Sequence, residues 1–247
     1  ELIWWDARQP ARYGVFINHQ QKIKNFRLVL GGNVESLQSY LQENDQFRFR
    51  GNFKTKYVLP KNKRISFGLN GNVMKETSGR FFIAQDADSN AYRIAEGSED
   101  RYVRTNLDPH FTYQNESGHR LTINMRYLNV WRRGNGDDPN ASSNLISFNN
   151  QYQKNWNDRF ILTTGLPFEI GVSRSNLYEG QRNNYNGASF AQGEFRHKDL
   201  SLVAGVRYEF TSVDTIFETT IPVVRTGLNY KFGRATYVRA SWGQAYR

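Results

Sequence analysis

Cysteine is absent from the 247-residue chain, which excludes a disulfide framework, a thiolate zinc site and a cysteine nucleophile. Only four histidines occur, and this scarcity argues against a histidine-rich metal site. Hydrophobic residues make up 38% of the chain, and no apolar run approaches the roughly 18 residues that a transmembrane helix needs. Residues 1–6 also lack the basic segment and cleavage site of a signal peptide. Disulfide-rich, zinc-binding and helical membrane classes are therefore disfavoured.

Aromatic residues, by contrast, are plentiful. They reach 15% of the chain, with 17 Phe, 14 Tyr and 5 Trp, and disordered segments are poor in such residues. The net charge is +10. A polar average does not exclude a membrane protein, because a transmembrane barrel combines lipid-facing apolar residues with a polar lumen.

Strict alternation is the strongest local pattern. In the segment 47–57, Phe, Gly, Thr and Tyr occupy the odd positions, and Arg, Asn and Lys occupy the even ones. A period of two predicts a β-strand with one apolar and one polar face, since a helix would scatter the cations all round. Similar patterns predict strands at 13–20, 26–37, 47–58, 65–74, 102–114, 120–131, 145–153, 159–174, 186–196, 200–211, 223–232 and 236–245. The predicted fold is all-β, an antiparallel meander of about 12 strands.

The connections between these strands alternate in length. The short ones are 21–25, 59–64, 115–119, 154–158, 197–199 and 233–235. The long ones, rich in Asn, Asp, Gly and Ser, are 38–46, 75–101, 132–144, 175–185 and 212–222. This rhythm puts short turns at one end and long loops at the other, as in outer-membrane barrels. The alternation favours part of a transmembrane β-barrel over a soluble all-β domain, which stays the alternative.

Catalytic signatures are missing from the sequence. It holds no G-x-S-x-G elbow, phosphate-binding loop, G-x-G-x-x-G or H-E-x-x-H motif. We therefore predict no enzyme, no catalytic or metal-ligating residue and no cofactor. A complete twelve-stranded outer-membrane pore or enzyme stays open as an alternative.

Cations of the strands need counter-charges, water or a partner, because like charges lie only two residues apart. On the barrel hypothesis they face the lumen, where they would contact an internal plug or an anionic solute; solvated surface cations are the plainer alternative. The predicted lumen-facing residues are Arg48, Arg50, Lys54, Lys56, Arg104, Arg207 and Glu209. A soluble module for polyanions is a further alternative. Nucleic acid is not expected, because the aromatics lie opposite the cations, whereas a stacking platform needs both on one face.

Aromatic and basic residues of the long loops are candidates for contacting a substrate at the outer mouth. Packing of the loops against one another is the alternative. These candidates are Phe81, Phe82, Tyr92, Arg132, Tyr178 and Tyr185.

Two segments carry a family resemblance. Residues 239–247 read R-A-S-W-G-Q-A-Y-R, and residues 204–209 read A-G-V-R-Y-E. Both resemble barrel strands of the TonB-dependent outer-membrane receptors, especially the Bacteroidetes branch. The resemblance implies a 22-stranded barrel filled by a plug domain, of which residues 1–247 would be a partial barrel without the plug and the C-terminal strands.

The same resemblance implies a function in the bacterial outer membrane. The expected function is TonB-dependent import of a scarce solute, which would be a siderophore, haem, cobalamin, glycan or peptide. The solute would bind at the extracellular loops, and TonB would then drive rearrangement of the plug. The implied partners are the plug, the TonB complex, outer-membrane lipid with lipopolysaccharide, and a surface lipoprotein.

Overall fold

The computed structural model describes residues 9–41, 43–79, 86, 88, 99–134 and 140–244. Regular structure in these ranges is entirely β, and the strands form one sheet. The strands are β1 (Ala11–Ile23), β2 (Phe26–Gln38), β3 (Gln46–Val58), β4 (Ile65–Gly79), β5 (Glu99–Gln114), β6 (His119–Arg133), β7 (Ala141–Trp156), β8 (Phe160–Gly165), β9 (Phe168–Ser175), β10 (Gln181–His197), β11 (Leu200–Val213), β12 (Ile216–Thr219), β13 (Val223–Phe232) and β14 (Thr236–Gly243). None of the described segments is a helix long and apolar enough to cross a membrane.

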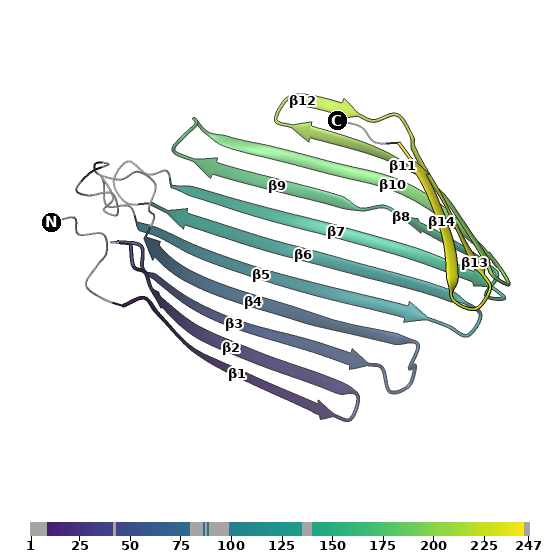
Figure 1. Ribbon diagram of the computed structural model, residues 1–247, viewed down its shortest axis with the longest axis horizontal. Helices are drawn as coiled ribbons and strands as arrows, with labels where there is room; N and C mark the ends of the chain where they lie inside the picture. Colours follow the sequence, from purple (N-terminus) through teal and green to yellow (C-terminus); the bar gives the residue numbers. More distant parts are fainter. Residues whose placement is uncertain are drawn as a thin grey trace.

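The sheet is an antiparallel meander, which confirms the predicted all-β fold. Its order is β1-β2-β3-β4-β5-β6-β7-β8-β10-β11-β13-β14, with β9 continuing the line of β8 and β12 pairing with β11. Figure 1 shows a single curved layer in which β1 and β14 lie at opposite ends. Because consecutive strands run in opposite directions, their connections alternate between two ends of the sheet. The six short turns lie together at one end, and the longer connections lie at the other.

Cross-strand register divides the side chains into two faces, because directly opposed residues of antiparallel strands share a face. Phe53 is opposed by Leu30 and Gly71, whereas Arg48 is opposed by Glu35 and Glu76. The alternation predicted for 47–57 is therefore confirmed. Followed through the pairings, the apolar face includes Val15, Val34, Phe49, Phe67, Leu107, Ile123, Ile146, Ile170, Val206 and Leu228.

The described sheet has almost no interior of its own. Among the described residues, only Ile161 and Val223 are buried hydrophobic side chains. Large apolar side chains are instead exposed along the apolar face: Ile17 is 68% exposed and Val15 is 63% exposed. An apolar surface of this extent requires an apolar partner. In a membrane barrel that partner is lipid.

Two details of the predicted strand list are wrong. The strand predicted over 159–174 is interrupted at Leu166 and Pro167, where Pro167 has no backbone N–H to donate. Asn150 of β7 repairs the ladder there. Its Oδ1 accepts from the Leu166 N–H at 2.9 Å, and its Nδ2 donates to the Leu166 carbonyl at 3.2 Å. The connection 212–222, predicted as a loop, contains β12, which forms a short hairpin with β11.

The break between β8 and β9 does not shift the register. Gln151 opposes Gly165 before it and Phe148 opposes Phe168 after it, so the residue numbers of each pair keep the same sum. Side chains beyond the break therefore stay on the faces that alternation assigns to them.

The two edge strands do not meet. Among the described strands no ladder joins β1 to β14, and the sheet is an open arc (Figure 1). The terminal strands are therefore well separated, which disfavours closure of these strands into a small twelve-stranded barrel.

Asn150→Ala should destabilise the protein by about 1–3 kcal/mol, because it leaves the Leu166 N–H and carbonyl without a partner. The measurement is the free energy of unfolding in denaturant, for the protein in detergent or lipid. Asn149→Ala, on the exposed polar side of the same strand, is the matched control and should change stability little. Equal stability of the two variants would contradict this role for Asn150.

Candidate functional site

The polar face holds every residue that the sequence predicted to face a lumen. Arg48, Arg50, Lys54 and Lys56 share one side of β3. Arg104 of β5 lies on the same side, because Met74 opposes both Arg50 and Arg104. The pairings through β6–β10 place Arg207 and Glu209 of β11 there too. Whether these residues contact a plug or a solute stays a prediction.

Ion pairs line much of this face. Arg48 Nε lies 2.6 Å from Glu76 Oε2, and Arg126 Nε lies 2.7 Å from Asp108 Oδ1. Further pairs on the face are Arg12–Glu35, Arg182–Asp214, Arg196–Glu194 and Arg207–Glu209. On β3, the Glu76 carboxylate offsets the charge of Arg48 beside Arg50.

Arg132 forms the most enclosed of these ion pairs. Its Nη2 lies 2.8 Å from Asp100 Oδ1, with side-chain exposures of 20% for Arg132 and 4% for Asp100. The guanidinium also lies over the Tyr102 ring, at 5.9 Å from the ring centroid. A buried pair of this kind is strongly destabilised when one partner is removed, because the other charge is left uncompensated. Arg132 is thus held within the sheet.

A second set of polar-face cations has no acidic partner within the described part of the chain. The members of this set nearest the β1–β2 and β3–β4 turns are Lys22, Arg27, Lys54 and Lys56. Lys22 opposes Arg27, and Arg27 opposes Lys56, so three cations lie side by side on three strands near the short turns. We call these four residues the basic tract. Sequence reasoning missed Lys22, because the first strand was predicted to end at residue 20, and it missed Arg27, because only the register places it beside Lys22 and Lys56.

An amide row crosses the same face next to the basic tract. Asn18, Gly31, Asn52, Asn72 and Asn106 occupy one register line across β1–β5. A Cβ at Gly31 would lie 2.7 Å from Asn18 Oδ1 and 2.8 Å from Asn52 Oδ1, so a larger residue there would displace these two amides. The amides offer both donors and acceptors without net charge.

Two hollows on the polar face are lined in part by residues of β7. One, of about 540 Å³, includes Glu169, Arg207 and Glu209 in its lining. The other, of about 400 Å³, is lined in part by His110 and the Arg126–Asp108 pair. Sequence reasoning missed His110. Its Nδ1 is buried and has no hydrogen-bond partner among the described residues. The polar face thus offers charged and neutral hydrogen-bonding groups to whatever lies against it.

The structure describes only some of the residues that were predicted to contact a substrate from the long loops. Phe81, Phe82 and Tyr92 lie outside the described residues. Tyr178 lies in the connection 176–180, with the Arg182 guanidinium 5.5 Å from its ring centroid.

Two of the loop assignments are wrong in position. Arg132 belongs to β6, and Tyr185 belongs to β10, where it opposes Ile170 on the apolar face. Both strands continue past the segment in which apolar and polar residues alternate. Near the long loops, polar residues also pair in the backbone ladder. Neither residue is therefore a loop side chain at the outer mouth.

No group of three or more His, Asp or Glu side chains that could hold a metal ion occurs within the described ranges.

Asp214, in the turn before β12, connects that turn to β10. Its carboxylate accepts from the Asn183 N–H at 2.8 Å and from Arg182 Nη1 at 2.9 Å. The Asn183 hydrogen bond, followed by the Arg182 hydrogen bond, lowers the pKa of Asp214 below its ordinary value. A lowered folded-state pKa contributes stability above the ordinary Asp value, and that stability is lost as the pH falls through the folded value.

Acidification should therefore loosen the contact between the β11–β12 hairpin and β10. We expect the hydrogen-exchange protection of the Asn183 amide, corrected for the intrinsic rate at each pH, to fall below about pH 4. Asp214→Ala should show the same low protection already at neutral pH, whereas Asp199→Ala, in a short turn at the other end, should not. Protection in Asp214→Ala equal to that of the unaltered protein would refute the contact.

Comparison with known families gives one match that covers nearly the whole chain. The family described as "TonB dependent receptor-like, beta-barrel" matches residues 5–247. The comparison with curated proteins finds no match.

Solved structures share the fold at low sequence identity. The FrpB iron transporter from Neisseria meningitidis has a TM-score of 0.80 at 12% identity, covering 95% of this chain and 44% of that one. The ferric-catecholate import receptor Fiu from E. coli K12 has a TM-score of 0.76 at 10% identity, covering 95% and 53%. The alcaligin outer-membrane receptor FauA from Bordetella pertussis has a TM-score of 0.73 at 12% identity, covering 97% and 41%. The chain thus spans about half the length, or less, of these structures.

Proposed function

Because this chain belongs to the TonB-dependent receptor β-barrel family, we propose that it forms part of the wall of a barrel that imports a scarce solute. Members of this family are bacterial outer-membrane proteins that act as transporters and receptors rather than as enzymes, and they work with a plug domain and TonB. The observation that carries the proposal is the two-faced single layer, in which an apolar surface backs a charged and amide-rich one.

Residues outside these 247 complete the barrel in this proposal. A lipid-exposed strand edge leaves backbone N–H and C=O groups unpaired, at a cost of several kcal/mol each. Both β1 and β14 have such an edge. Further strands, giving about 22 in all as in plugged transporters, and a plug inside the lumen would satisfy the edges and cover the polar face.

Two alternative functions receive less support. A complete twelve-stranded pore or enzyme needs β1 to pair with β14, and the two strands are far apart in the sheet order. A soluble polyanion-binding module would leave the apolar face in water, at about 25 cal/mol for each Å² of apolar surface.

Five solute classes fall within the proposal: ferric siderophores, haem, cobalamin, glycans and peptides. The titles of similar structures speak of an iron transporter, a ferric-catecholate import receptor and an alcaligin receptor. Those words describe the neighbours, and at 10–12% identity they support the fold of this chain rather than its solute. Lipopolysaccharide and a surface lipoprotein are proposed partners at the long-loop end.

Uptake measurements in the source bacterium test the proposal. Deleting the gene should abolish uptake of one solute class from a panel of the five, and removing TonB should abolish the same uptake. A plasmid copy of the gene should restore it. Uptake that continues without TonB would instead identify a passive pore, and normal uptake of all five classes after gene deletion would contradict import.

The basic tract supplies a second test, because unpaired cations on the polar face should contact the plug or an anionic solute. Lys54→Gln with Lys56→Gln should slow uptake severalfold without changing the amount of folded protein in the outer membrane. Lys61→Gln with Lys63→Gln removes the same charge from the short turn between β3 and β4 and is the matched control. Equal uptake by the two double variants would remove the tract from the transport path.

A further inference from the structure

One cation lies on the apolar face near the short turns. Lys154 of β7 opposes Leu162 of β8, and His119 of β6 opposes Lys154. In the half of the apolar face nearest the short turns, Lys154 is the only Lys, Arg, Asp or Glu on the described strands. A charge on a lipid-facing surface is costly at the membrane midplane but tolerated near an interface, which fits the position of Lys154 near the short turns.

Hydrogen bonds fix the protons around this cation. Lys154 Nζ donates to the Ser117 carbonyl at 2.6 Å and lies 2.8 Å from His119 Nε2. Because an ammonium can only donate, His119 Nε2 must accept. The neutral imidazole then carries its proton on Nδ1 and donates it to Tyr152 Oη at 2.6 Å. This series of hydrogen bonds leaves the Tyr152 O–H and one N–H of the Lys154 ammonium without an acceptor among the described residues. We call Lys154, His119 and Tyr152 the interface trio.

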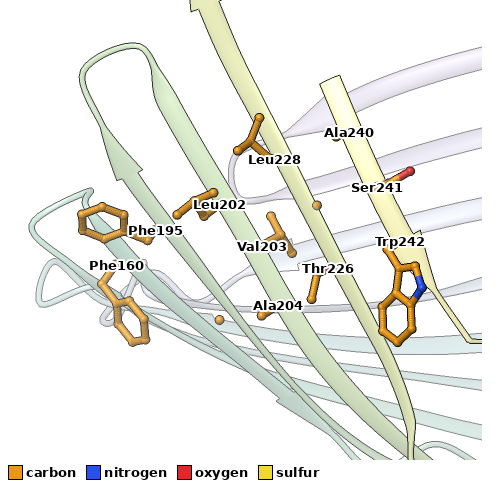
Figure 2. A pocket seen from close by; sticks show the side chains of 12 residues that line it. Phe160, Phe195, Leu202, Val203, Ala204, Thr226, Leu228, Ala240, Ser241 and Trp242 are labelled. Atoms are coloured by element: carbon orange, nitrogen blue, oxygen red, sulfur yellow. The ribbon is translucent and has the colours of Figure 1, made fainter. Parts of the chain in front are cut away.

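An apolar hollow lies beside the interface trio on the same face. Its volume is about 540 Å³. Its lining includes the small residues Gly193, Ala204 and Ala240 together with larger apolar side chains. Figure 2 shows Phe160 and Phe195 at one end of the hollow and Trp242 at the other.

The trio and the hollow are connected through aromatic rings. The Trp156 ring lies 5.4 Å from that of Phe160, at the end of the hollow. The Lys154 ammonium lies 5.7 Å from the Trp156 ring centroid. Two free donors, one of them on the Lys154 cation, therefore adjoin the apolar hollow, and this combination matches a molecule with an anionic head and a hydrocarbon tail.

We propose that the interface trio and the adjoining hollow bind a phospholipid of the membrane leaflet on the short-turn side. The phosphate accepts from Lys154 and Tyr152, and one acyl chain lies over Gly193, Ala204 and Ala240. Short turns of outer-membrane barrels are periplasmic, so this lipid belongs to the periplasmic leaflet. The inference rests on the proposed function only in placing the apolar face in the membrane.

The choice of a lipid over a free anion follows from the surroundings. Apart from the trio, the neighbouring strand residues of this face offer apolar side chains, such as Leu121, Leu162 and Phe160. A soluble phosphate would gain nothing from these contacts, whereas an acyl chain gains roughly 0.8 kcal/mol for each buried CH₂ group.

Lipid titration of the purified full-length protein tests the site. The probe is phosphatidylglycerol, added to delipidated protein and counted by native mass spectrometry. Lys154→Gln should weaken binding about tenfold, as expected for loss of a hydrogen bond to a charged group. Tyr152→Phe, which removes one hydroxyl, should weaken it severalfold. Lys56→Gln removes the same charge from the polar face and should bind like the unaltered protein.

The hollow and the source of the anion are tested in the same assay. Ala204→Phe should weaken binding of long-chain phosphatidylglycerol but not of the dihexanoyl form. Equal binding by Lys154→Gln and Lys56→Gln, or displacement of the lipid by excess inorganic phosphate, would overturn the proposal. Heat-modifiable migration on gels checks that each variant is folded. If Lys154→Gln does not fold, Tyr152→Phe still tests the site.

Failure here is distinguishable from failure of the import proposal. Loss of lipid binding in Lys154→Gln with normal TonB-dependent uptake supports both proposals. Lipid binding that depends on Lys154, in a protein whose deletion changes no uptake, supports the lipid site and contradicts import.

Discussion

Backbone hydrogen bonding is the constraint on which the rest of this structure depends. Hydrocarbon offers no partner to an N–H or a carbonyl, so each strand must satisfy these groups on its neighbours. The continuous ladder from β1 to β14 does this with a single layer. Where Pro167 interrupts the ladder, the Asn150 amide replaces the missing bonds. A polar amide on the lipid-facing side is tolerated at that point because both of its groups are paired.

Once the ladder is fixed, alternation decides where charge can lie. Side chains on the apolar face of the strands contact lipid. Nearly every charged side chain of the membrane-crossing part lies on the polar face. The polar face then neutralises itself locally through pairs such as Arg132–Asp100 and Arg126–Asp108. The basic tract departs from this rule. Three of its residues, Lys22, Arg27 and Lys56, oppose one another without acidic partners in the described part of the chain, and like charges directly opposite each other destabilise a sheet. This cost is reasonable for a surface that another component covers.

Much of the fold could be predicted from the sequence, because a period of two marks both the strands and their faces. The segregation of Phe47–Tyr57 followed directly from it, as did the meander and the sorting of short and long connections. The site was less predictable. Arg132 and Tyr185 were assigned to loops, since strand ends near the loops are polar and alternation no longer marks them. Lys22 and Arg27 join Lys56 only through register, which depends on hairpin geometry. The link between Lys154, His119 and Tyr152 needs contacts across two strands that no local pattern encodes.

The meander has a consequence for how such a wall is built and altered. Within the described sheet, each long strand contacts only the strands next to it in the chain, so no pairing there depends on segments far apart in sequence. Contacts of this kind demand little loop-closure entropy and favour growth from one edge, hairpin by hairpin. A hairpin added or removed would widen or narrow the arc by two strands while leaving the remaining registers untouched. Circumference is therefore a modular property of this architecture, adjustable in steps that preserve which side of every strand meets the membrane.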